Sequence, residues 1–216
     1  MFSRNDFWAQ VRRTIMGRPM NGDELEVLVT HLRDQLLLGR HDVLLDLGCG
    51  NGALSAELFE ACSGCVGADL SSYLIGVARQ YFERIPDYVF FHADALEFAL
   101  SVGEPGRFTK ALCYAVIPYL PLDEVRAIVQ VLYRRFSGIS RLVLGNIPDR
   151  DKAGLFFRDG YDRDILDQHE SQIGRWWSHD EVASIASAAG WDVTFVHMPE
   201  HFFNARYRFD AVLTRL

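Results

Sequence analysis

The sequence has little of what would place it in a membrane or among nucleic-acid-binding proteins. Its longest apolar runs are far shorter than the about 20 residues of a transmembrane helix. Residues 1–4 lack the basic-then-apolar pattern that begins a signal peptide. Lys and Arg (22) are outnumbered by Asp and Glu (29), so the net charge is −7. Because an acidic chain does not attract phosphate backbones or anionic lipids, we expect a cytoplasmic protein with neither nucleic acid nor membrane as a partner.

Cysteine is also scarce, and its spacing excludes the common cysteine-based sites. Of the four cysteines, only Cys62 and Cys65 form a C-x-x-C pair. A zinc site needs about four ligands, and no second pair or suitably spaced His cluster accompanies this one. A redox pair should lie between a strand and the start of a helix, whereas this pair follows a helix. The sequence therefore predicts no metal site.

The most informative stretch is V-L-L-D-L-G-C-G-N-G, Val43–Gly52. Its apolar start is typical of a strand buried on both faces, and this strand contains the carboxylate of Asp46. Three glycines on alternate positions follow, which indicates a turn where backbone approaches a ligand. Good helix formers come next, at Ala53–Leu58. A strand, a glycine loop and a helix in this order predict a nucleotide-cofactor site at the carboxyl ends of parallel strands.

Strands and helices alternate regularly along the rest of the chain. After the strand at 43–47, further strands are predicted at 65–69, 88–92, 108–116, 141–145, 191–198 and 207–213. The last two runs have no helix between them, so they should pair as an antiparallel hairpin at one edge of the sheet. The pattern predicts an α/β fold in one domain spanning residues 1–216, with a doubly wound and mostly parallel sheet.

Two segments stand apart from this alternation. Helices predicted at 5–16 and 23–39 precede the first strand, so residues 1–40 are expected to form a helical lid or to cover a sheet edge. Residues 149–177 are rich in Asp, Arg, Phe and Tyr and have no sustained period. Because long irregular connections are often functional, we interpret 149–177 as a flap over the acceptor side of the site. The sequence leaves open whether the protein is a monomer or a homodimer.

Three carboxylates, Asp46, Asp69 and Asp94, lie at or just beyond successive strand ends. In a parallel sheet they point into one crevice. Acids combined with backbone N–H groups suit a ligand rich in hydrogen-bond donors, such as an ammonium, a ribose diol and an adenine amino group. They suit a pyrophosphate poorly, because the carboxylates would repel it.

With these motifs the chain resembles the class I S-adenosylmethionine-dependent methyltransferases of the small-molecule type. The resemblance spans roughly residues 42–216 and rests on the glycine loop, the G-A-D-L-S stretch at 67–71, H-A-D-A at 92–95 and the terminal hairpin. It implies a seven-stranded sheet whose last strand is inserted antiparallel. It also implies S-adenosylmethionine as cofactor, with S-adenosylhomocysteine as product.

The resemblance assigns roles by position. Asp46 would lie near the cofactor's amino group, Asp69 would accept from both ribose hydroxyls, and Asp94 from the adenine amino group. Tyr114, at the end of the fourth strand, would lie near the sulfonium. The complete set of implied cofactor-binding residues is Asp46, Gly48, Cys49, Gly50, Asn51, Gly52, Asp69, Leu70, Asp94, Ala95 and Tyr114.

The catalytic residues are harder to assign. Methyl transfer needs in-line positioning, and a hydroxyl acceptor also needs a base. Many members of the family carry a His just after the fourth strand, where this chain has Pro118. Alternative candidates for the base are His169, His179 and His201. The segment at 149–177 also has a cationic side that an anionic acceptor would match, formed by Arg158, Arg163 and Arg175.

The hypothesis is methyl transfer to an oxygen or nitrogen atom of a small molecule, with a sugar or secondary metabolite as the guessed acceptor. The Asn/Asp-Pro-Pro-Tyr/Phe signature of nucleic-acid and protein amide methylases is missing after the fourth strand. One alternative is an NAD-dependent oxidoreductase, because Gly48-x-Gly50-x-x-Ala53 fits the dinucleotide fingerprint tolerably. Another is a non-catalytic protein that kept the cofactor pocket.

Overall fold

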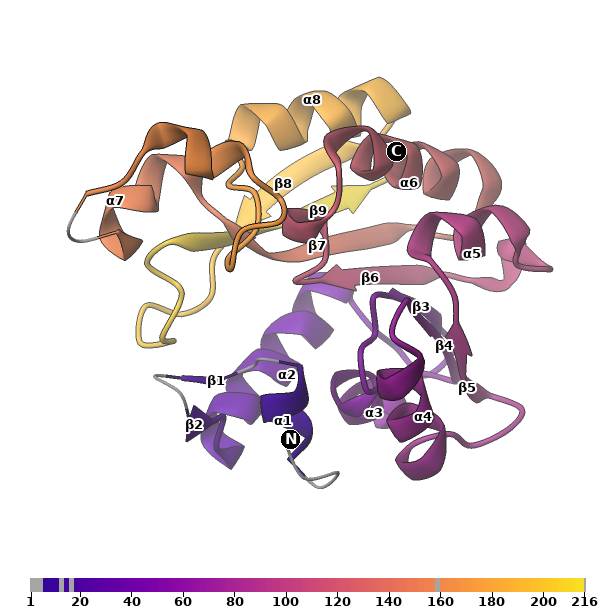
Figure 1. Cartoon of the computed structure of the whole chain (residues 1–216). Coiled ribbons are helices and arrows are strands. Elements are labelled where there is room, and N and C mark those ends of the chain that lie inside the picture. The colour runs from indigo at the N-terminus through magenta and orange to yellow at the C-terminus, as the bar shows by residue number, and fades with distance from the viewer. Residues whose placement is uncertain (1–5, 12–13, 16–17, 158–159, 216) are drawn as a thin grey trace.

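The computed structural model describes residues 6–11, 14–15, 18–157 and 160–215. A seven-stranded sheet in the order β5-β4-β3-β6-β7-β9-β8 runs through the molecule (Figure 1). Its strands are β3 Val43–Leu47, β4 Gly64–Asp69, β5 Tyr88–His92, β6 Lys110–Tyr114, β7 Arg141–Pro148, β8 Asp192–Val196 and β9 Arg208–Thr214. β5, β4, β3, β6 and β7 are parallel, and β9 is antiparallel to both β7 and β8. The predicted mostly parallel sheet with an antiparallel terminal hairpin is confirmed.

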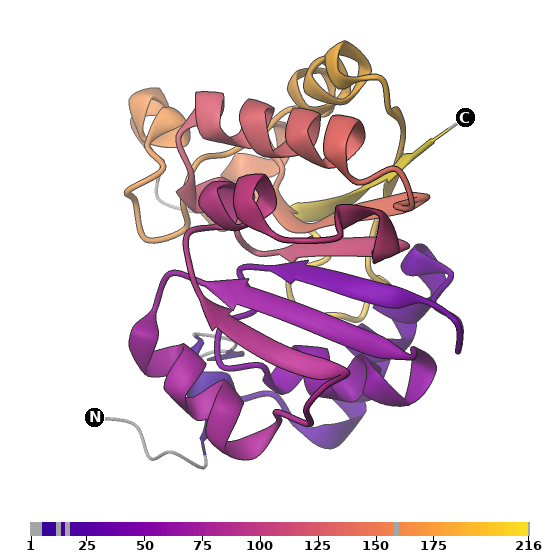
Figure 2. The same ribbon diagram turned by 90° about the vertical axis from the view of Figure 1, so that its right-hand side faces the viewer.

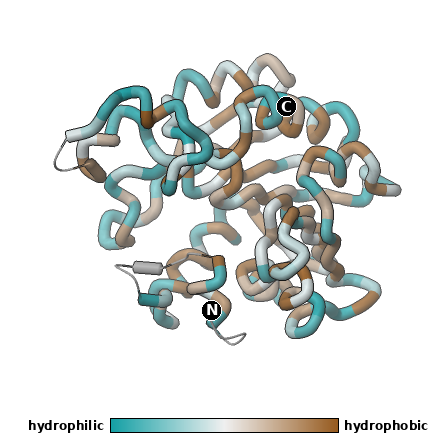
Figure 3. Tube along the Cα trace, viewed as in Figure 1, coloured by the Kyte–Doolittle hydropathy of each residue, from teal (hydrophilic) through white to brown (hydrophobic). Residues whose placement is uncertain are grey.

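Helices cover both faces of this sheet, as two perpendicular views show (Figures 1 and 2). One face carries α2 (Gly22–Leu36), α3 (Ala53–Leu58) and α4 (Ser72–Tyr81), and the other carries α5 (Ala95–Ser101), α6 (Leu122–Arg135) and α8 (His179–Ala189). Each face therefore has its own apolar core. The strands are mostly apolar, whereas the outer turns of the 149–177 segment are mostly hydrophilic (Figure 3).

Local sequence signals explain where two of the helices, α2 and α8, begin. α2 starts at a capping box in which Asn21 accepts from the Glu24 backbone and Glu24 accepts from the Asn21 backbone. α8 has the same arrangement between Ser178 and Glu181, and it ends at Gly190 in the left-handed conformation. These caps satisfy backbone N–H groups that have no partner within the helix.

The prediction of a helix at 5–16 is wrong over part of its length. α1 spans only Phe7–Gln10, and β1 (Thr14–Ile15) pairs antiparallel with β2 (Arg18–Pro19). Apolar residues at three-to-four spacing over so short a stretch are compatible with one helical turn followed by a tight hairpin, so periodicity alone does not separate the two. Residues 1–5, 12–13 and 16–17 lie outside the described part of the chain.

The 149–177 segment is irregular, and its end at Trp176 and Trp177 is buried. It contains the short helix α7 (Ala153–Phe156) and two 3₁₀ turns, η4 (Arg150–Lys152) and η5 (Arg163–Asp167). Trp176 and Trp177 are both fully buried, and Trp177 belongs to the core beneath α6 and α8. Within the described residues, no helix is long and apolar enough to cross a membrane.

Candidate functional site

The glycine loop between β3 and α3 brings two parts of the chain into close contact. Gly48, Gly50 and Gly52 have φ values of +75°, +62° and +75°, which L side chains rarely adopt. A Cβ added to Gly48 would lie 2.2 Å from Cγ2 of Val116, in the turn after β6. A glycine at position 48 is therefore required both by the backbone conformation and by the approach of this second turn.

Asp69, at the end of β4, is tied to this loop through its carboxylate. The Gly50 N–H donates to Oδ2 (2.9 Å) and the Ser71 N–H donates to Oδ1 (2.8 Å). An ionised carboxylate offers about four lone-pair directions, so these two bonds leave acceptor capacity on both oxygens. Asp69 is thus oriented by the backbone and still able to accept from a diol.

Asp94 is the N-cap of α5. Its Oδ1 accepts from the N–H groups of Leu96 (2.9 Å) and Glu97 (3.0 Å). These bonds hold the side chain just beyond the end of β5 and use Oδ1. Oδ2 is the oxygen that can accept from a ligand. Ala95 is the first residue of α5, so its N–H has no acceptor in the preceding turn of the helix.

A cavity of about 260 Å³ lies at the carboxyl ends of β3, β4, β5 and β6. Seven of the eleven residues predicted to bind the cofactor line it: Gly48, Gly50, Asp69, Leu70, Asp94, Ala95 and Tyr114. A larger surface groove between α6 and α8, of about 770 Å³, contains none of them. We take the smaller cavity as the candidate site, because it alone of the two holds the clustered acids and the glycine loop.

The other four predicted residues, Asp46, Cys49, Asn51 and Gly52, do not line the cavity. Asp46 is 3% exposed and accepts from the Ser55 hydroxyl (2.6 Å). Cys49 is buried, and burial, followed by the nearby charges of Asp46 and Asp69, raises the pKa of its thiol. The thiol therefore stays protonated, and Cys49 contributes packing under the loop. Direct cofactor contacts by these residues remain predictions.

Asn51 connects the glycine loop to the N-terminal segment. Its Nδ2 donates to the Phe7 carbonyl (2.7 Å) and to Oε1 of Gln10 (3.0 Å), and its side chain is almost fully buried. Val11 follows directly and lines the cavity, with its Cγ1 only 2.9 Å from where a Cβ on Gly50 would be. The segment at 6–11 therefore lies over the glycine loop.

Sequence reasoning missed the apolar lining of the cavity. It consists of Val11, Leu74, Ala115, Val116, Tyr119 and Leu120. Most of these residues belong to turns, where no hydrophobic period marks them. Ala115 has φ +61°, an unusual backbone for an alanine, and it follows Tyr114 directly. This strained turn after β6 faces the glycine loop, and nothing in the sequence indicates it.

None of the three histidines proposed as a base lines the cavity. His201 is exposed in the loop between β8 and β9, and His179 lies at the start of α8. His169 and the cavity residue Asp94 act in opposite directions on the pKa of Glu124.

Glu124, in the first turn of α6, is a candidate base that the sequence did not reveal. Burial and then the charge of Asp94 raise the pKa of this carboxyl, while His169 opposes the shift. Its Oε1 is buried and has no hydrogen-bond partner among the described residues. Like the three histidines, Glu124 does not line the cavity, and its link to the cavity is the interaction with the charge of Asp94.

Of the three arginines predicted to form a cationic side of 149–177, Arg175 is paired with carboxylates. Arg175 is 2.8 Å from Glu181 and 3.3 Å from Asp167, and its backbone N–H donates to the Pro118 carbonyl beside the cavity (2.7 Å). Arg163 is exposed, and Arg158 lies outside the described residues. The segment thus contacts the rim of the cavity through its backbone, with Arg175 engaged in ion pairs.

Comparison with known sequences agrees with this geometry. Residues 44–137 match the family model described as a methyltransferase domain. A ubiquinone biosynthesis O-methyltransferase from Aromatoleum aromaticum is 37% identical over 79 residues, which are 36% of this chain and 33% of that protein. An O-antigen chain terminator bifunctional methyltransferase/kinase from Escherichia coli is 30% identical over 137 residues, 57% of this chain and 19% of that protein. These matches span a third or less of either relative.

Solved structures share the fold over almost the whole chain. Magnesium protoporphyrin IX methyltransferase from Synechocystis, with bound S-adenosylhomocysteine, superposes with a TM-score of 0.64 at 18% identity, covering 98% of this chain and 86% of that one. The N-methyltransferase NodS from Bradyrhizobium japonicum gives 0.64 at 18% identity, covering 90% and 98%. The sheet order and these structures show that the chain has the fold of the class I S-adenosylmethionine-dependent methyltransferases, and residues 44–137 match a methyltransferase domain.

Proposed function

We propose that this chain transfers the methyl group of S-adenosylmethionine to an oxygen or nitrogen atom of a small-molecule acceptor. The observation that carries the proposal is the cavity in which Asp69, Asp94 and the glycine loop converge. Two carboxylates with remaining acceptor capacity match a ligand that has a ribose diol and an adenine amino group. They do not match a pyrophosphate, which the acids would repel.

The residues of the chain act mainly by positioning. Asp69 is oriented to accept from the ribose, and Asp94 to accept from the adenine amino group. S-adenosylmethionine, when bound, supplies a methyl group already activated by the sulfonium. The apolar turn at Tyr114–Val116 and Val11 of the N-terminal segment would then exclude water from the reacting atoms. Of the predicted lid at 1–40, residues 6–11 are in this view the part that covers the site, fastened through Asn51, while α2 packs on the sheet; residues 149–177 are the flap on the acceptor side.

The acceptor is proposed from chemistry and from the named relatives. One is named a ubiquinone biosynthesis O-methyltransferase, another an O-antigen chain terminator methyltransferase/kinase, and a third an N-methyltransferase. Phenols, sugars and amines are thus the classes to test first. A hydroxyl acceptor needs a base, and we add Glu124 with its neighbour His169 to the candidates.

Two measurements test the proposal. Calorimetry should show binding of S-adenosylhomocysteine and none of NAD at the same concentrations. Incubation with methyl-labelled S-adenosylmethionine should then transfer label to at least one member of a panel of phenols, sugars and amines. Binding of NAD with none of S-adenosylhomocysteine would support the oxidoreductase alternative and refute the proposal. Cofactor binding without turnover across a broad panel would instead favour a non-catalytic binding protein.

A further inference from the structure

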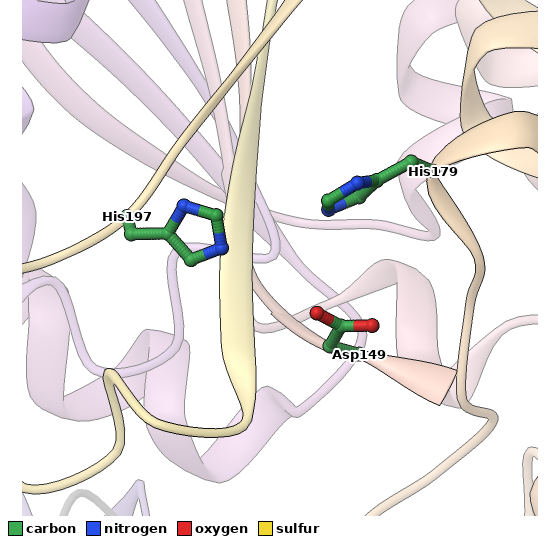
Figure 4. Close-up of side chains that lie close together, drawn as sticks. All are labelled: Asp149, His179 and His197. Carbon is green, nitrogen blue, oxygen red and sulfur yellow. The ribbon is translucent and has the colours of Figure 1, made fainter. Parts of the chain in front are cut away.

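Three side chains of the types that bind metals lie close together just beyond the carboxyl ends of β7 and β8. Asp149 directly follows β7, His197 directly follows β8, and His179 is the first residue of α8. One ligand atom from each lies within 4.8 Å of the other two, and the three side chains turn toward a common space (Figure 4). None of them lines the candidate cofactor cavity. The cluster is therefore distinct from the site described above.

The ring of His179 is held in place. It stacks on Phe195 at 4.4 Å between ring centres, with 15° between the planes, and it meets Phe209 edge to face at 4.4 Å. Its Nε2 is buried and has no hydrogen-bond partner among the described residues. A buried imidazole nitrogen without a partner is unusual, because such atoms are normally satisfied. It indicates that something beyond the side chains of this cluster is meant to contact it.

A cation already occupies part of this space. The ammonium of Lys152 lies 3.3 Å from Oδ2 of Asp149 and 3.1 Å from Nε2 of His197. With bonds of 2.0–2.1 Å, the ligands of a tetrahedral zinc lie about 3.4 Å apart, whereas the longer contacts to an ammonium hold them farther apart. The three ligand atoms of the cluster lie within 4.8 Å of one another, a spacing that fits the bound ammonium. The Lys152 side chain is 36% exposed, so it has a route to solvent.

We propose that Asp149, His179 and His197 form a binding site for a divalent cation of the zinc type, which replaces the Lys152 ammonium. Two imidazoles and one carboxylate are a ligand set that binds zinc and neighbouring first-row metals. Three protein ligands leave the fourth position of a tetrahedral ion open for water or another ligand.

The site can be tested with the full chain freed of metal by a chelator. Zn²⁺ is titrated against a chromophoric competitor, and Co²⁺ is added separately to detect the visible absorption of a tetrahedral site. His197→Ala is a suitable variant because His197 is exposed, and Asp149→Asn keeps an N-cap acceptor for the Asp151 N–H. His41→Ala, at another exposed histidine, is the matched control.

We expect one equivalent of Zn²⁺ to bind to the wild type and to His41→Ala. His197→Ala and Asp149→Asn should each weaken binding at least about 100-fold, since each loses a ligand. Lys152→Met should strengthen it about tenfold, because a competing positive charge is removed. Equal affinity in the wild type and His197→Ala would overturn the proposal. Binding seen only in Lys152→Met would overturn it too, because the ammonium would then be the natural occupant.

Discussion

Replacing Asp69 by alanine should weaken S-adenosylhomocysteine binding without unfolding the protein. In the structure this carboxylate accepts from the Gly50 and Ser71 N–H groups and keeps acceptor capacity on both oxygens for the ribose hydroxyls. A hydrogen bond to a charged group contributes about 1.5–3 kcal/mol, and loosening of the loop and water replacement reduce what is measured. We therefore expect a loss of about 1–3 kcal/mol, or about 5- to 150-fold in the dissociation constant.

Isothermal titration calorimetry at neutral pH measures this loss directly, and a thermal melt of the same samples reports folding. Asp87→Ala is the matched control, because it removes an exposed carboxylate just before β5 and outside the cavity. It should bind like the wild type. If Asp69→Ala also binds within about twofold of the wild type, well below the expected range, the ribose is not held by Asp69 and the cofactor has been placed wrongly.

Two further predictions concern the N-terminal segment. Asn51→Ala removes the hydrogen bonds to the Phe7 carbonyl and to Gln10, so amide hydrogen exchange at 6–11 should accelerate and S-adenosylhomocysteine should bind about 3- to 10-fold more weakly. Gln10→Ala removes only one of these bonds and should have a smaller effect. Unchanged hydrogen exchange in Asn51→Ala would show that Asn51 does not hold the N-terminal segment on the loop. The hydrogen bond from Arg18 lowers the pKa of Glu24 to about 2 from 4.5, so the pair should stabilise the fold above about pH 4.5 and lose this effect as the pH falls toward 2. Glu24→Gln keeps a side-chain acceptor for the Asn21 N–H. In urea titrations its free energy of unfolding should be lower than that of the wild type by under about 1 kcal/mol at neutral pH, and equal to it near pH 2. A difference that does not change with pH would contradict a stabilising charge interaction between Arg18 and Glu24.

The cofactor side of the fold was predictable because its signals are local. The glycine loop, Asp69 and Asp94 each follow a strand within a few residues, and parallel strands bring their carboxyl ends together. The terminal hairpin was predictable because no helix separates its two runs. Such inferences need only the order of elements and the chemistry of single motifs.

Contacts between distant residues gave no such signal. Nε2 of His31 in α2 lies 2.7 Å from Oδ2 of Asp210 in β9, and Asp210 also accepts from the Asn146 N–H (2.6 Å). Asn146 takes φ +61°, at the point where β7 has an irregular register with β9. Each residue alone is an ordinary helix, strand or turn residue. The same holds for His179, which the sequence offered only as one of three candidate bases, although the structure places it beside Asp149 and His197. Only tertiary structure brings such groups together.

The position of β9 has a consequence for how the chain is made. β8 is synthesised before β9 but lies beyond it in the sheet, at the edge, and pairs only with it. While a ribosome still holds Arg208–Thr214, β7 has an open edge and β8 has no neighbour to pair with. A nascent chain at that stage presents unpaired strand edges, which favour association with other chains. Emergence of β9 completes the sheet, so the interval between the synthesis of β8 and that of β9 is the stage at which this protein would most depend on chaperones.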